Sequence, residues 1–124
     1  MEWTFDRAPD WSWRVWVKAW HSGTEWKYNV YADLHPSHPL HSFTRDGIRY
    51  MPFHGGVSSD TFIEWSPPKP AYDWEKVYKI RRVGSDYGHD GDWYGEDDPK
   101  DGIPTRVYLD ACELVKFLRE YLQE

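Results

Sequence analysis

The sequence lacks the features that mark secreted and membrane-spanning proteins. It contains one cysteine, Cys112, so no disulfide bond can form within the chain. Residues 1–10 show no basic start followed by an apolar run, and no stretch approaches the roughly 18 apolar residues of a membrane helix. We therefore expect a protein of a reducing cytoplasm that does not associate with membranes.

Positive charge and aliphatic side chains are also scarce. Lysine and arginine number 15 against 21 acidic residues, which gives a net charge of −6 and a pI near 5.4. This balance argues against direct binding of duplex nucleic acid through its phosphates, but it is compatible with small phosphorylated ligands. Aromatic residues reach 19%, and we expect most of these rings to fill a core that contains few Leu and Ile.

The length and the hydrophobic patterns predict one domain over residues 1–124. Alternation of apolar and polar residues predicts an antiparallel hairpin over about residues 12–33. Further strands are predicted over residues 48–53, 61–65 and 76–83. Apolar residues at three-and-four spacing predict a helix over residues 105–122, with Cys112 as a packing residue beside its apolar stripe. The fold class is therefore α+β, a small antiparallel or mixed sheet with one C-terminal helix packed on it.

Two segments are predicted to be loops, and each has a pattern that suggests a metal ion. Pro36 and Pro39 interrupt residues 35–42, where His35, His38 and His41 recur every third residue. In a polyproline helix such neighbours lie roughly 9 Å apart, whereas zinc holds an imidazole nitrogen at about 2 Å. An exposed polar loop is therefore expected there.

The second loop, about residues 84–103, is rich in glycine and carboxylates. Its beginning matches part of the calcium-binding EF-hand pattern, with Asp86 in the first ligand position. However, Gly88 occupies the third ligand position, and no helix precedes the loop. The EF-hand interpretation is therefore disfavoured.

Three short motifs occur in a fixed order along the chain. They are His38-Pro39-Leu40, His54-Gly55-Gly56-Val57-Ser58 and Gly84-x-Asp86-x-x-His89-x-Gly91-Asp92. Together with a short C-terminal helix, this set resembles a family of small uncharacterised phage and prophage proteins over roughly residues 28–122. This chain departs from the family pattern at Ser58, where Thr is usual, and in the acidic segment after Asp92. The resemblance implies that the His and Asp side chains of the motifs converge, but it supplies no established activity.

These residues lead to the hypothesis of a pocket for a small phosphorylated ligand such as a nucleotide. His54 and His89 would act as acid and base, and Asp86 or Asp92 would orient an imidazole or hold a divalent cation. The ligand itself would be bound by His38, Gly55, Gly56 and Gly91. With turnover the protein would be a phosphoesterase-type hydrolase, and without turnover it would sequester the ligand. A phage context would favour a host signalling nucleotide, a counter-defence role and the cytoplasm of the host cell.

Two other classes of function stay open at this point. The acidic loop carries seven carboxylates between Asp86 and Asp101, so it could imitate nucleic acid and block a host protein. Alternatively, the aromatic hairpin could be an interface of a minor structural or assembly protein, which would associate through Trp16 or Trp20. A function that is lost in His54→Ala and His89→Ala would favour the pocket over both alternatives.

Overall fold

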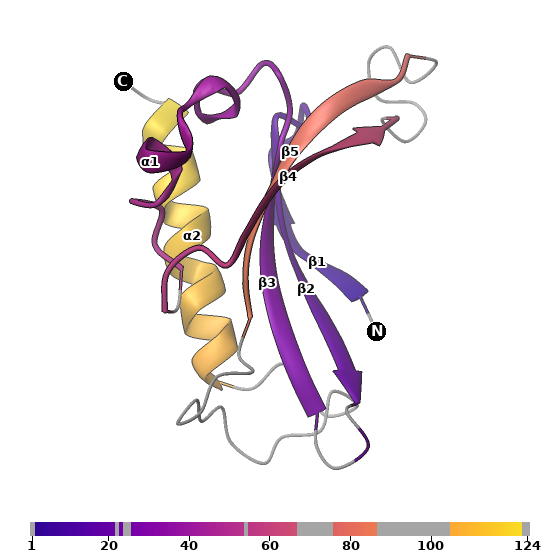
Figure 1. Cartoon of the computed structure of the whole chain (residues 1–124), viewed down its shortest axis with the longest axis vertical. Helices are drawn as coiled ribbons and strands as arrows, with labels where there is room; N and C mark the ends of the chain where they lie inside the picture. The colour runs from indigo at the N-terminus through magenta and orange to yellow at the C-terminus, as the bar shows by residue number, and fades with distance from the viewer. Residues whose placement is uncertain are drawn as a thin grey trace.

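The computed structural model describes residues 2–21, 23, 26–53, 55–66, 76–86 and 105–122 (Figure 1). They form a five-stranded antiparallel sheet in the order β1-β2-β3-β5-β4, with one long helix, α2, at the C-terminal end. The strands are β1 (Glu2–Arg7), β2 (Trp13–His21), β3 (Trp26–Leu34), β4 (Ser59–Trp65) and β5 (Tyr78–Asp86). The predicted α+β fold is confirmed.

The hairpin and the C-terminal helix agree closely with the sequence patterns. β2 and β3 pair from Trp13 opposite Leu34 to His21 opposite Trp26, inside the predicted hairpin. α2 spans Thr105–Leu122, as its apolar spacing predicts. Cys112 is partly buried on this helix. β1 was not predicted; it forms one edge of the sheet, and β4 forms the other.

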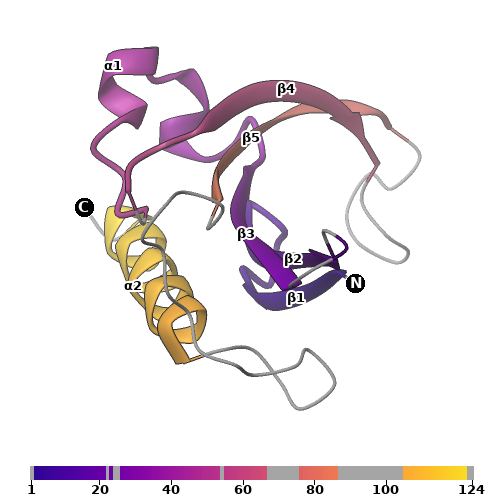
Figure 2. The same ribbon diagram turned by 60° about the horizontal axis from the view of Figure 1, so that its bottom comes forward.

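The two faces of the sheet have different partners. One face packs against α2, and its buried apolar side chains come from alternate positions of β2 and β3: Trp13, Val15, Val17, Ala19, Tyr28, Val30, Ala32 and Leu34. Figures 1 and 2 show α2 on this side only, while the far ends of β4 and β5 curve away from the helix. We call the opposite face the open face, because no helix formed by the described residues covers it.

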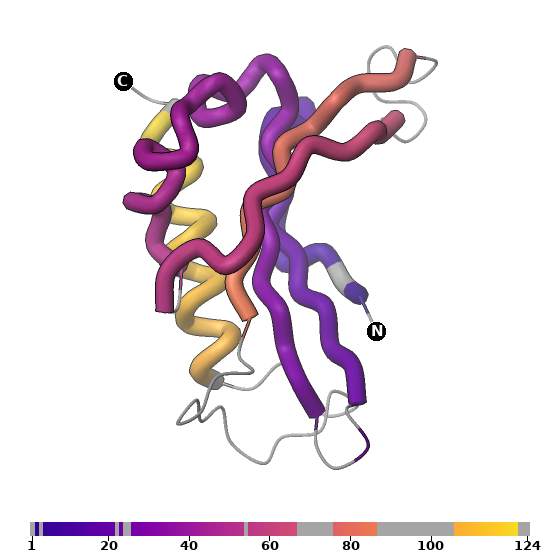
Figure 3. The backbone as a smooth tube through the Cα atoms, in the orientation of Figure 1, coloured from indigo at the N-terminus to yellow at the C-terminus, as the bar shows by residue number. Residues whose placement is uncertain are grey.

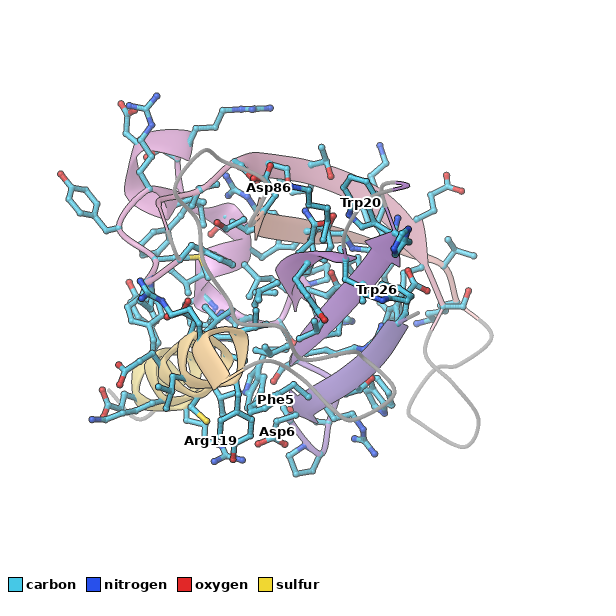
Figure 4. All side chains as sticks on the ribbon, turned by 90° about the horizontal axis from the view of Figure 1, so that it is seen from below. Phe5, Asp6, Trp20, Trp26, Asp86 and Arg119 are labelled. Carbon is cyan, nitrogen blue, oxygen red and sulfur yellow. The ribbon has the colours of Figure 1, made fainter. Side chains whose placement is uncertain are left out.

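A β-bulge in β1 connects the sheet edge to α2. The pairing register with β2 shifts between Thr4 and Asp6, a break that places two consecutive side chains on the helix side. The Phe5 ring contacts the Tyr108 ring edge-to-face at 5.3 Å, and Arg119 forms an ion pair with Asp6 at 2.6 Å. Figure 4 shows Phe5, Asp6 and Arg119 together beside the helix.

The prediction of a strand over residues 48–53 is wrong. Residues 45–48 form the short helix α1 (Arg45–Ile48), which Thr44 caps by accepting a hydrogen bond from the Gly47 N–H, and residues 49–53 continue as a turn without regular structure. Ile48 and Met51 are both buried, and their three-residue separation suits a helical turn better than a strand. The backbone then passes α2 before it enters β4, as the tube in Figure 3 shows.

The other segment boundaries differ modestly from the predictions. The predicted loop over residues 35–42 contains a 3₁₀ helix, η1 (Pro39–Ser42). Residues 84–86 of the predicted acidic loop belong to β5, and residues 87–103 lie outside the described part of the chain.

Candidate functional site

The second and third motifs meet where β4 begins and β5 ends. Ser58 donates two hydrogen bonds to the Gly84 carbonyl, from its backbone N–H at 2.8 Å and from its hydroxyl at 3.3 Å. Gly55 and Gly56, just before this contact, have φ angles of 66° and 88° and are exposed. Nothing lies within 4 Å of a side chain placed at either glycine, so their backbone is open to approach.

Gly84 has a packing role at this junction. A Cβ atom there would lie 2.6 Å from Cε1 of Tyr31 and 3.0 Å from Oγ of Ser59, so the Tyr31 ring requires a glycine beneath it. Asp86 follows two residues later on the same face of β5, opposite Asn29 of β3. Burial raises the pKa of the Tyr31 hydroxyl, the charge of Arg82 opposes this effect, and Asp86 adds to it. Asp86 is partly exposed, and its position in the register places its carboxylate on the open face.

His38 lies in the core between η1 and α2. Its side chain is 1% exposed, its Nδ1 accepts a hydrogen bond from the Leu40 N–H at 3.1 Å, and its ring stacks on Tyr121. Burial lowers its pKa to about 4, an effect that the nearby Leu118 backbone opposes. The side chain is thus neutral near pH 7 and caps η1. A ligand would reach it only after η1 or α2 moved.

The three histidines of residues 35–42 have separate partners. His35 interacts with Ser37 through Nδ1, and His41 contacts the Lys79 carbonyl through Nε2 at 2.8 Å. Within the described ranges, no three His, Cys, Asp or Glu side chains are arranged to hold a metal ion. His54, His89, Gly91 and Asp92 lie outside those ranges, so their convergence and a cation between Asp86 and Asp92 stay predictions.

A small cavity lies beside the junction of the motifs, between α1 and the start of β4. Its volume is about 180 Å³, and its lining includes Arg45, Arg49, Ser58, Ser59 and Asp60. Ligand pockets usually measure about 300–1,000 Å³. The cavity can therefore take the end group of a ligand and not the whole molecule.

The charge of Asp60 in this lining is already compensated. Arg81 forms a two-point ion pair with it, at 2.7 Å to Oδ1 and 2.6 Å to Oδ2, and the Arg81 side chain is only 3% exposed. Arg81 also donates hydrogen bonds to the carbonyls of His41 and Phe43, which fixes η1 and the entry to α1 against the sheet. Arg45 and Arg49 supply the positive charges of the cavity lining, and Arg49 has only a long contact with Asp46 at 3.9 Å.

Sequence reasoning missed both of these arginines, although one signal was available. Arg45 and Arg49 are four residues apart after the N-cap residue Thr44, so a short helix would place them on one side. A larger hollow of about 690 Å³ between β1 and α2 was also missed. Phe5, Tyr108, Cys112 and Arg119 are among its lining residues, and none of the predicted site residues lies there.

Comparisons of the chain with protein-family models, with curated proteins and with solved structures gave no match. The resemblance to the phage protein family therefore stays a prediction that depends on the three motifs. In the described part of the chain, neither helix has the length and apolar character needed to cross a membrane.

Proposed function

We propose that this protein binds a small phosphorylated molecule, such as a nucleotide, with a phosphoryl group in the cavity between α1 and β4. The observation that carries this proposal is the lining of the cavity, which combines Arg45 and Arg49 with Ser58 and Ser59. Guanidinium groups are strong donors to phosphate oxygens, and the Ser58 hydroxyl already donates to the Gly84 carbonyl, so the two arginines would bind the phosphoryl group. The pairing of Asp60 with Arg81 compensates the negative charge in the lining of the cavity.

The surroundings of the cavity support a ligand that extends beyond it. With a volume of about 180 Å³, the cavity would hold the phosphoryl end, and the rest would lie toward the exposed Gly55 and Gly56. Arg49 has a weak ion pair with Asp46 at 3.9 Å, in which both side chains are largely exposed. A phosphate would therefore displace little existing structure.

Turnover of the ligand is a further part of the proposal. His54 and His89 would act as acid and base, and Asp86 and Asp92 would orient an imidazole or hold a divalent cation. Asp86 supports this assignment because it lies two residues beyond Gly84, which contacts Ser58 of the second motif. The phage-like order of the motifs favours a host signalling nucleotide as the ligand and a counter-defence role.

The test is an incubation of the purified protein with linear and cyclic nucleotides, with and without a chelator. Mass spectrometry of the filtrate and of the denatured protein then separates hydrolysis from sequestration. New products that disappear in His54→Ala or His89→Ala would identify a hydrolase, and intact nucleotide recovered after denaturation would identify a binding protein. If every nucleotide stays free and unchanged, the proposal is refuted.

The exposure of the hairpin tryptophans bears on the interface hypothesis for the aromatic hairpin. Trp16 is only 5% exposed and stacks on Tyr31, whereas Trp20 is 44% exposed. Of the two residues predicted to mediate association, Trp20 alone presents an accessible ring. We therefore rank binding of a phosphorylated ligand above association through the hairpin.

A further inference from the structure

The open face of the sheet carries a row of basic side chains. The strand registers align Arg7, Arg14, Asp33, Arg82 and Thr61 across all five strands. Three positive charges and one negative charge thus share one row in a protein whose net charge is −6. Such a local excess of positive charge favours the binding of an anion.

Arg14 and Arg82 share a single carboxylate unequally. Arg82 binds Asp33 through Nε at 2.8 Å and Nη2 at 3.0 Å. Arg14 approaches the same carboxylate only to 3.9 Å, and its Nε donates to the Thr4 hydroxyl at 2.8 Å. Consequently Nη1 and Nη2 of Arg14 and Nη1 of Arg82 have no hydrogen-bond acceptor among the described residues.

Both guanidinium groups lie over the same indole ring. Their Cζ atoms are 5.2 Å (Arg14) and 4.7 Å (Arg82) from the Trp16 ring centroid. Trp16 is 5% exposed and stacks on Tyr31 with a centroid separation of 4.5 Å. Both guanidinium groups therefore pack against a buried aromatic ring. The two arginine side chains are 25% and 27% exposed, so their unused donors face solvent.

The electrostatics of the cluster indicate which charge an anion would carry. Burial lowers the pKa of Arg14, the carboxylates of Asp33 and Glu2 oppose this effect, and the charge of Arg82 lowers it further. Two guanidinium groups and the Asp33 carboxylate leave one positive charge, which the Glu2 carboxylate of β1 offsets in part. A singly charged anion therefore matches the cluster better than a doubly charged one.

We propose that Arg14 and Arg82 form a binding site for a singly charged oxoanion, either a carboxylate or a phosphodiester, on the open face. Arg14 would donate through both terminal nitrogens and Arg82 through Nη1, which is the geometry that guanidinium groups use with paired oxygens. This site is separate from the cavity at α1, so it does not depend on the proposed function.

The test is a titration of ¹⁵N-labelled protein with benzoate, diphenyl phosphate, phenyl phosphate and the neutral benzamide. The signals to follow are the Nε–H groups of Arg14 and Arg82 and the indole N–H of Trp16, the last assigned with Trp16→Phe. We expect saturable shifts of all three with benzoate or diphenyl phosphate, and the stronger ligand identifies the chemical source. No shift with either, or tighter binding of phenyl phosphate or benzamide, would overturn the assignment.

Variants locate the site and separate it from the cavity. Arg14→Gln should weaken binding at least tenfold and keep the fold, since Asp33 retains its hydrogen bonds to Arg82. Arg7→Gln is the control, because Arg7 belongs to the same row but lies over Trp11 at 4.1 Å. The double variant Arg45→Ala/Arg49→Ala should bind the probe like the unmodified protein. Unchanged affinity in Arg14→Gln would contradict the proposal.

Discussion

Acidification should destabilise this protein through the buried His38. The folded state lowers the pKa of this side chain from 6.5 to about 4 because burial disfavours the charged ring. Between these two pH values the unfolded chain takes up a proton and the folded chain does not. Each pH unit in this range therefore lowers the free energy of unfolding by about 1.4 kcal/mol. The whole shift corresponds to about 3 kcal/mol, a large share of the roughly 5–15 kcal/mol that stabilises most domains.

The sign of this effect is fixed by the direction of the shift. Above pH 6.5 the His38 ring is neutral in the folded and unfolded states, so the free energy of unfolding is not reduced there. Below about pH 4 the ring is protonated in both states, and the free energy of unfolding has lost the whole contribution of this shift. His35 acts in the same direction, since burial also lowers its pKa. Titrating carboxylates contribute too, so the effect of His38 must be measured as a difference.

The assay is urea unfolding between pH 7.5 and pH 5, with His38→Asn as the comparison. Asparagine can accept the hydrogen bond from the Leu40 N–H but cannot take up a proton in this range. We expect the unmodified protein to lose about 2 kcal/mol more than the variant over the 1.5 pH units below 6.5. His21→Asn is the control, because His21 is exposed at the end of β2. Equal pH dependence in His38→Asn and the unmodified protein would refute the reasoning.

Two further substitutions test the packing that positions the site. Gly84→Ala should destabilise the fold by about 1–3 kcal/mol because the new methyl group overlaps the Tyr31 ring. Adding Tyr31→Ala to this variant should restore part of the lost stability. An unchanged urea midpoint in Gly84→Ala would contradict the close packing of Tyr31 on Gly84. Arg81→Met should destabilise the fold by about 3–5 kcal/mol, since Asp60 would keep a largely buried charge without its partner. Adding Asp60→Asn should recover stability, and thermal unfolding of the single and double variants measures the difference.

The sequence predicts elements whose signals are local and misses those that depend on pairing. The β2–β3 hairpin and α2 have uninterrupted periodicity over at least two turns or several alternations, and both were predicted correctly. β1 was missed because its bulge places Phe5 and Asp6 on the same side and so interrupts the alternation. The strand predicted over residues 48–53 was wrong because short apolar runs fit a helical turn equally well.

The candidate sites also depend on strand pairing, which local sequence patterns do not reveal. The second and third motifs meet through Ser58 and Gly84, which the β4–β5 pairing brings into contact, whereas the convergence of the His and Asp side chains of the motifs stays a prediction. Arg14, Asp33 and Arg82 come from three strands, and only the cross-strand register aligns them. A single sequence does not specify this register, although the alternation of β2 already places Arg14 and Trp16 on the same face. His38 was grouped with the ligand-binding residues by motif order, whereas its burial depends on α2, which lies far along the chain.

The central claim is that a phosphoryl group occupies the cavity at α1, and calorimetric titration tests it most directly. The nucleotide retained best in the panel should be titrated into the unmodified protein and into Arg45→Ala/Arg49→Ala. A double variant of the exposed residues Lys18 and Arg106, each changed to Ala, removes the same charge elsewhere and serves as the control. The account predicts at least a tenfold loss of affinity in the cavity variant and little change in the control. Equal affinity in all three proteins would contradict it.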